Sequence, residues 1–134
     1  MKTLNTIFII EDSTLDRTML KDHLSKKSKI KITEYSSGDA CVKELVMGTI
    51  DPPDLILMDY FLDSSFGPAK DGLETLARIN EICPETSVIM YTSVDNERII
   101  ELAKKKGALD YVVKNATGFS KLDSVLEKHF SVTK

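Results

Sequence analysis

The chain has no tryptophan and only two cysteines among its 134 residues. Cys41 and Cys83 lie far apart and form no Cys-x-x-Cys pair, which excludes a disulfide-rich framework. Each stands among apolar residues at helical spacing, so we interpret both as buried core thiols and not as metal ligands. This sparing use of cysteine favours a reducing compartment, the cytoplasm.

Long apolar runs and an excess of positive charge are also missing. The apolar runs are far shorter than a membrane span requires, and the first strand begins too soon after Met1 to leave room for a signal peptide. The net charge is −3, so no diffuse positive field exists to attract nucleic acid. We interpret the one dense basic cluster, Lys104–Lys106, as the solvated end of a helix. We therefore expect neither a membrane nor a nucleic acid as a partner.

The composition is otherwise that of an ordinary globular protein, with 42% hydrophobic and 29% charged residues. The length suits a single domain spanning residues 1–134. Short apolar runs alternate five times with stretches of helical period, without a linker. The predicted strands are Thr6–Ile10, Ile30–Tyr35, Asp54–Met58, Ser87–Tyr91 and Leu109–Val113. The predicted helices are Thr14–Lys27, Asp39–Met47, Gly72–Ile82, Asp95–Lys106 and Ser120–Phe130.

This alternation predicts a parallel sheet between two layers of helices, a doubly wound α/β fold. Ile7–Ile10, Leu55–Met58 and Val88–Met90 are continuously apolar, as strands buried on both faces should be. Ile30–Thr33 alternates with polar residues, which is typical of an edge strand. In such folds ligands bind beyond the carboxyl ends of the strands, so we expect the functional residues there.

Polar side chains follow the predicted strands at these ends: Glu11 and Asp12, then Asp59, then Thr92, then Lys114. Three carboxylates in one cleft repel one another unless a cation is present. Mg²⁺, or Mn²⁺ in its place, prefers such oxygen ligands and leaves positions for water and phosphate. The ammonium of Lys114 would offset the charge of a phosphoryl group on a carboxylate, and Thr92 could hydrogen-bond that group.

These residues, Glu11-Asp12, Asp59, Thr92-Ser93 and Tyr111–Lys114, together resemble the receiver domain of response regulators in two-component signalling. Each motif alone is weak, but all of them in register with five strand and helix units are specific. The resemblance covers Thr6–Phe130. It implies a flavodoxin-like three-layer sandwich with sheet order 2-1-3-4-5, and a stand-alone switch of the chemotaxis-regulator type.

The resemblance also implies a role for each site residue. Asp59 would be the phospho-acceptor, receiving its phosphoryl group from a histidine kinase or a histidine phosphotransfer protein. Asp12 and Asp59 would bind the metal directly, Glu11 mainly through its waters, and the backbone carbonyl of Phe61 would be a further ligand. Lys114 would contact the phosphoryl oxygens.

Two residues are implied to carry the conformational switch. In the family the hydroxyl residue, here Thr92, moves toward the phosphate, and an aromatic residue, here Tyr111, turns inward behind it. The alternative for Tyr111 is an amphipathic cover for the sheet edge. The responding surface would be the fourth helix, fifth strand and fifth helix, which would bind a downstream protein. Only Ser131–Lys134 follow the fifth helix, so we expect no output domain.

The chain departs from the family pattern in the loop that follows the acceptor. Residues Tyr60–Asp71 separate Asp59 from Gly72, about five more than usual, at modest entropic cost. Phe66, beside Gly67-Pro68, is either a partner contact at the mouth of the site or part of a neutral insertion.

A second departure follows Lys114. Asn115 stands where the family commonly has a proline preceded by a cis bond. A cis bond before a non-proline residue costs about 2.5–4 kcal/mol, so we predict a trans bond here and a lysine that is held less rigidly.

Other functions remain alternatives. A receiver fold could serve as a phosphorylation-independent docking adaptor. A haloacid-dehalogenase-type phosphatase needs a second acid two residues after its nucleophile, where this chain has Phe61. A flavodoxin needs a phosphate loop rich in hydroxyls and glycine after the first strand, and Glu11-Asp12 would repel the flavin phosphate. We expect no enzyme activity beyond self-catalysed phosphotransfer and dephosphorylation, and we interpret His23 and His129 as structural or surface groups.

Overall fold

The computed structural model describes residues 1–26, 29–62 and 71–131. Within them a five-stranded parallel sheet has the order β3-β2-β4-β5-β6, and a separate pair joins β1 to β7. The strands are β1 (Lys2–Thr3), β2 (Thr6–Ile10), β3 (Lys31–Tyr35), β4 (Leu55–Met58), β5 (Ser87–Thr92), β6 (Asp110–Val113) and β7 (Phe130–Ser131). The helices are α1 (Thr14–Ser25), α2 (Gly38–Met47), α3 (Gly72–Ile82), α4 (Glu97–Lys105) and α5 (Gly118–His129).

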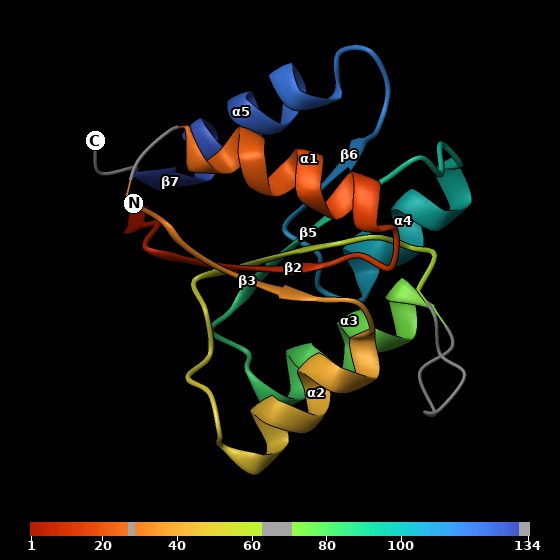
Figure 1. Ribbon diagram of the computed structural model, residues 1–134. Coiled ribbons are helices and arrows are strands. Elements are labelled where there is room, and N and C mark those ends of the chain that lie inside the picture. The colour runs from red at the N-terminus through yellow and green to blue at the C-terminus, as the bar shows by residue number, and fades with distance from the viewer. Residues whose placement is uncertain (27–28, 63–70, 132–134) are drawn as a thin grey trace.

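The molecule has three layers, with α1 and α5 on one face of the sheet and α2 and α3 on the other (Figure 1). Successive residues of β2 alternate between two apolar clusters, because neighbouring side chains of a strand point to opposite faces. Ile7 and Ile9 pack with residues of α1 and α5. Phe8 and Ile10 pack with residues of α2, α3 and α4. Both faces of the sheet are therefore covered.

The predicted fold class and strand order are confirmed. Without the short β1 and β7, the order β3-β2-β4-β5-β6 is the predicted order 2-1-3-4-5. All four residues of β4 are buried, as its continuous apolar run indicates. The strand predicted to lie at an edge, β3, does so. Most element ends differ from the prediction by no more than two residues, where capping and sheet register decide the boundary.

The prediction was wrong at the two chain ends. It gave no strand to Lys2–Thr3 and extended the last helix to Phe130, but α5 ends at His129 and Phe130–Ser131 pairs with β1. A two-residue strand carries no periodic signal, because it exists only through pairing with a distant segment. The start of α5 at Gly118 was also missed, since glycine is a poor helix former.

Individual residues set the start of α1 and the end of α4. The Ser13 hydroxyl accepts a hydrogen bond from the Asp16 N–H at 3.2 Å and so caps the start of α1. Gly107 follows α4 with φ of 109°, a conformation that favours glycine, just after Lys106, where the helix was predicted to end. Lys104–Lys106 are exposed at this helix end, as expected.

The start of α3 lies tightly against the segment that follows β4. A Cβ atom at Gly72 would stand 2.3 Å from the Asp59 carbonyl oxygen, so only glycine fits here. The Gly72 N–H donates to the Tyr60 carbonyl at 2.7 Å. These contacts anchor the far end of the loop after Asp59. Phe66 and Gly67-Pro68 lie outside the described residues, so their predicted role is untested.

The two cysteines, Cys41 and Cys83, are buried and unpaired, as predicted. Across the part of the chain that the structure describes, we find no helix with the length and hydropathy of a membrane span.

Candidate functional site

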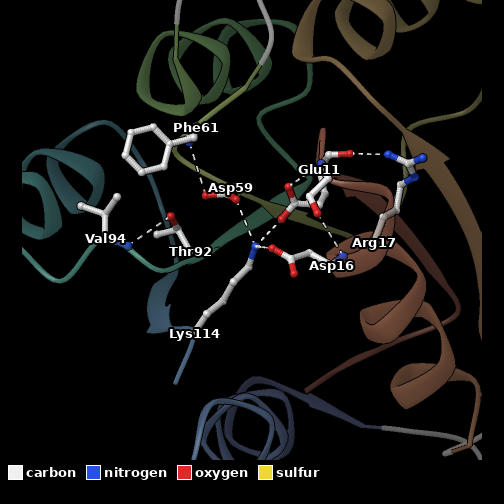
Figure 2. A network of polar contacts seen from close by, with 9 residues as sticks. Glu11, Asp16, Arg17, Asp59, Phe61, Thr92, Val94 and Lys114 are labelled. Carbon is white, nitrogen blue, oxygen red and sulfur yellow. Dashed lines mark hydrogen bonds and ion pairs between the residues drawn. The ribbon is translucent and has the colours of Figure 1, made fainter. Parts of the chain in front are cut away.

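The polar residues predicted at the strand ends meet at the carboxyl edge of the sheet (Figure 2). Glu11 follows β2, Asp59 follows β4, Thr92 ends β5 and Lys114 follows β6. Backbone hydrogen bonds like those between the strands continue beyond the strand ends and hold these residues in line. Glu11 N–H donates to the Tyr35 carbonyl at 3.0 Å, Asp59 N–H to the Ile10 carbonyl at 3.2 Å, and Lys114 N–H to the Thr92 carbonyl at 2.7 Å.

Three carboxylates form the base of the site. Glu11, Asp12 and Asp59 each place an oxygen within 4.8 Å of the others. Glu11 is 3% exposed and Asp59 7% exposed, whereas Asp12 is open to solvent. Hard oxygen donors this close together, with one on the solvent side, fit a hydrated divalent cation such as Mg²⁺. The acidic triad is therefore able to hold a metal ion.

Lys114 supplies the positive charge of the site. Its Nζ donates to Asp59 Oδ2 at 3.0 Å, to Asp16 Oδ2 at 3.2 Å and to Glu11 Oε1 (Figure 2). Burial works to lower the pKa of Lys114, but the hydrogen bond with Glu11 and the charges of Asp59 and Glu11 outweigh burial and raise it. Lys114 is therefore firmly protonated.

The pKa values of the two buried acids, Glu11 and Asp59, are shifted in opposite directions. Burial raises the pKa of Glu11 to about 7; the hydrogen bond from Lys114 opposes this rise, and Asp59 adds to it. Burial would also raise the pKa of Asp59, but its interactions with Thr92, Glu11 and Lys114 hold it below its ordinary value. The two acids of the site are therefore shifted as a pair, with the shared proton favouring Glu11 over Asp59.

The two predicted switch residues both hydrogen-bond the backbone of Val94, in the segment after β5. Thr92 is fully buried, and its Oγ1 accepts from the Val94 N–H at 3.4 Å. The half-buried Tyr111 donates its hydroxyl to the Val94 carbonyl at 2.6 Å. Thr92 lies close enough to Asp59 to lower the pKa of that carboxyl, while Tyr111 holds the same short segment from the neighbouring strand.

Phe61 borders the site through its backbone. Its N–H donates to Asp59 Oδ1 at 3.3 Å, and its side chain is 58% exposed (Figure 2). The backbone of Phe61 thus lies beside the acceptor, while ligation of a metal by its carbonyl stays a prediction. The trans bond after Lys114 is confirmed, since the described residues contain no cis peptide bond.

Two residues of α1 belong to the site although sequence reasoning gave them no role there. Asp16 binds Lys114, as described above. The Arg17 guanidinium donates to the Glu11 carbonyl at 2.6 Å and lies 3.7 Å from the Glu34 carboxylate. The sequence gives little indication of this role. Both residues lie about one turn after Asp12, at the start of a helix, and polar residues at such positions are ordinarily exposed to solvent.

The two histidines lie outside this cluster. His23 Nε2 is 2.7 Å from Asp123, and His129 Nε2 is 3.2 Å from Asp110. Each joins two elements of the fold, α1 to α5 in the first pair and α5 to β6 in the second. This agrees with the structural role expected for them.

Comparison with known proteins agrees with this geometry. Residues 7–127 match the family described as response regulator receiver domain. The chemotaxis protein CheY of Listeria monocytogenes is 31% identical over 108 residues, covering 81% of this chain and 84% of that protein. The BeF3-activated N-terminal receiver domain of RstA from Klebsiella pneumoniae superposes with a TM-score of 0.76 at 26% identity, covering 93% of this chain and 97% of that one.

The Mn²⁺-bound form of response regulator Rcp1 shares the fold, with a TM-score of 0.79 at 21% identity over 97% of this chain and 99% of that one. The family match spans all five strand-end positions, from Glu11 to Lys114. The chain therefore belongs to the response regulator receiver domain family, with single-domain chemotaxis regulators among its relatives.

Proposed function

We propose that the protein is a stand-alone, Mg²⁺-dependent phosphorylation switch with Asp59 as the acceptor. The observation that carries this proposal is the 7% exposed Asp59 carboxylate, which lies 3.0 Å from the Lys114 ammonium and within 4.8 Å of two further acids. A buried carboxylate so placed can act as a nucleophile, because Lys114 and a cation held by the acidic triad would compensate the charge of the incoming phosphoryl group. The proposed phosphodonor is a histidine kinase or a histidine phosphotransfer protein, as membership of the family implies.

The residues divide the chemistry among themselves. An Asp59 oxygen attacks the phosphorus of a phosphohistidine, the P–N bond breaks, and the imidazole leaves with its electron pair. Asp12, Asp59 and the Phe61 carbonyl are the proposed metal ligands, with Glu11 acting through metal-bound water. A Mg²⁺ ion held by these ligands would supply positive charge beside the transferring phosphoryl oxygens. Lys114 binds one of these oxygens in place of a carboxylate partner.

The phosphoryl group would then alter the segment after β5. Thr92 lies beside Asp59 and lowers the pKa of its carboxyl, so its hydroxyl is within reach of a phosphoryl oxygen there. Movement of Thr92 would pull on the segment to which the Tyr111 hydroxyl is tied through Val94. We propose that this shifts a two-state equilibrium on the face formed by α4, β6 and α5, and so changes the affinity for a downstream protein in the cytoplasm.

Labelling with a small phosphodonor tests the acceptor. The purified protein is incubated with Mg²⁺ and phosphoramidate, and the acyl phosphate is detected by intact mass. We expect the wild type to gain one phosphoryl group and Asp59→Asn to gain none. Asp51→Asn, which changes an exposed acid away from the site, is the matched control and should be labelled like the wild type. Equal labelling of Asp59→Asn would refute the assignment.

Metal dependence separates the switch from the docking adaptor that shares its fold. We expect labelling to stop when EDTA removes Mg²⁺ and to return when Mg²⁺ or Mn²⁺ is added. Absence of both metal binding and labelling in the folded wild type would favour the adaptor, which needs the surface of the fold but not its acids.

A further inference from the structure

Lys114 must point at Asp59 for the proposed function, yet little in its own loop directs it there. A lysine side chain is a flexible four-carbon stem that carries a strongly hydrated charge. The next residue, Asn115, is exposed and joined by a trans peptide bond, so no ring or cis bond restricts the backbone at this point.

The Lys114 side chain also lies beside a pocket that could accommodate it in another orientation. The pocket has a volume of about 280 Å³ and opens between the first turns of α1 and α5. Its walls include Asp16, Met19, Tyr91, Lys114, Asn115 and Phe119. Rotation of the lysine stem into this space would carry the ammonium away from Asp59 and toward water. Glu11, Asp16 and Asp59 attract the ammonium, and a contact along the side of the lysine would keep it from turning into this pocket.

The Tyr91 ring occupies the position to do this. Lys114 Nζ lies over the ring, 5.5 Å from its centroid, which is within the range of a cation–π contact. Tyr91 belongs to β5, directly before Thr92, and is 8% exposed. The negative face of the ring therefore adds to the attraction of the acids without adding another formal charge to the cleft.

The ring is itself held by a column of stacked rings. Phe119 of α5 stacks on Tyr91 with centroids 6.0 Å apart and an interplanar angle of 17°. His23 of α1 stacks on Phe119 at 4.3 Å and 4°, and its Nε2 is 2.7 Å from Asp123. The column thus links β5 to the two helices that cover this face of the sheet. Its rings keep the Tyr91 plane from turning.

We propose that Tyr91 is a positioning residue for phosphotransfer: its ring, held in the stack with Phe119 and His23, aims the Lys114 ammonium at Asp59. This inference rests on the proposed function of Asp59 and Lys114. Tyr91 touches no reacting atom, so its whole effect on the reaction passes through the lysine.

Substitution of the ring tests the proposal. Tyr91→Leu keeps an apolar side chain, though a smaller one, and removes the ring face; we expect the rate of labelling by phosphoramidate to fall about three- to tenfold. Tyr91→Phe keeps the ring and should label within about twofold of the wild type. Mg²⁺ affinity, measured by titration, should be unchanged in both variants, because the metal ligands do not contact this ring.

Two controls separate positioning from a general loss of structure. Phe130→Leu removes a ring that is 3% exposed in β7, beyond the end of α5 that is remote from Lys114, and it should lower the melting temperature without slowing labelling. In a Lys114→Ala background, Tyr91→Leu should cause no further loss of rate, since the lysine through which it acts is gone. An undiminished loss in that background, or wild-type labelling by Tyr91→Leu alone, would overturn the proposal.

A readout that needs no phosphorylation keeps this inference apart from the proposed function. In NMR spectra of the metal-free protein, the Lys114 ε-methylene protons should show an upfield ring-current shift that Tyr91→Phe keeps and Tyr91→Leu abolishes. If this shift is present but the wild type is never labelled, the proposed function fails while the contact stands. If the shift is absent in the wild type, the positioning role fails.

Discussion

The two ends of β4 each carry an aspartate, and the two carboxylates have opposite surroundings. Asp54, just before the strand, accepts hydrogen bonds at Oδ2 from the Asn5 N–H at 2.8 Å and the Thr6 N–H at 3.0 Å. Asp59, just after the strand, lies among Glu11, Asp12, Thr92 and Lys114, and accepts one backbone bond from Phe61. The same residue type therefore closes a local structure at one end and joins a crowded charged cluster at the other.

This difference follows from strand polarity. At the amino end, free backbone N–H groups point outward and bond the Asp54 carboxylate, whose one charged neighbour among the described residues is the half-exposed Lys2 ammonium at 3.9 Å. At the carboxyl end, carbonyl groups point outward, so acids there must find partners among one another, a lysine or a cation. An acid whose partners are backbone N–H groups, such as Asp54, has a structural role. Several acids that share one amine still have unused oxygen atoms, which can bind a metal or accept a phosphoryl group.

The largest contrast between the two ends should appear in metal binding. Asp12→Asn removes a carboxylate from the acidic triad, and we expect Mg²⁺ affinity to fall at least about tenfold. Asp54→Asn changes the acid at the other end of the sheet and should leave the affinity at its wild-type value. Isothermal titration of both variants measures the difference. Equal losses would show that the site is held by the overall charge and not by the triad.

The pH dependence of stability should also differ, through Glu11. Its pKa is raised to about 7 in the folded protein, above its ordinary value of 4.5. Between these values the folded state binds more protons than the unfolded state, so stability is highest below about pH 4.5 to 5 as far as this group is concerned, and falls as pH rises toward 7. In EDTA we expect the wild type to lose on the order of 2 kcal/mol between pH 5 and pH 8.

Urea unfolding at the two pH values measures this loss. Glu11→Gln removes the titrating group and should show a smaller fall over the same range, with the remaining groups unchanged. Mg²⁺ should restore the wild type at pH 8, because the cation favours ionised Glu11. A wild type whose stability falls no more between pH 5 and pH 8 than that of Glu11→Gln would contradict this assignment.

A smaller effect is expected from the structural acid. Asp54→Ala leaves the N–H groups of Asn5 and Thr6 without their carboxylate, and we expect a loss of about 1–2 kcal/mol in the free energy of unfolding. Labelling of Asp59 should proceed at the wild-type rate at temperatures where the variant is folded. Slower labelling would show that the two ends of β4 are coupled through the strand.

The smallest effect concerns the cap that starts α1 beside the acidic triad. Ser13→Ala removes the hydroxyl that accepts from the Asp16 N–H, at a cost of about 0.5–1 kcal/mol. The Ser13 N–H still donates to Glu11 at 3.1 Å, so Mg²⁺ affinity should change little. Thermal unfolding and Mg²⁺ titration of the same sample measure both. A marked loss of affinity would place the hydroxyl itself in the metal site.

Prediction from sequence was most successful where one strong local pattern decided the outcome. The apolar run Leu55–Met58 is buried on both faces, and the polar residues Glu11, Asp59, Thr92 and Lys114 meet at one edge of the sheet, as parallel strands require. Boundaries were less certain, because a start such as Gly118 opposes helix propensity and depends on packing.

Contacts between elements could not be predicted in the same way. Asp16 and Lys114 lie 98 positions apart, yet their side chains meet because α1 and the end of β6 converge above the sheet. Tyr91 reads as one more apolar strand residue, and its contact with the lysine depends on the packing of α1 and α5. The β1 to β7 pair likewise exists only because the two chain ends lie side by side.

The sequence by itself determined the fold class and the identity of the acids, hydroxyl and amine at the carboxyl edge of the sheet, while the order of the strands came from the resemblance to the receiver family. The fold class and these residue identities follow from period, strand polarity and residue type, which are local properties. Only the tertiary structure decided which acids share Lys114, how far the pKa of Glu11 and of Asp59 move apart, and which ring faces the ammonium. Those outcomes depend on distances of a few ångströms between side chains from different elements, and electrostatic energies change steeply over that range.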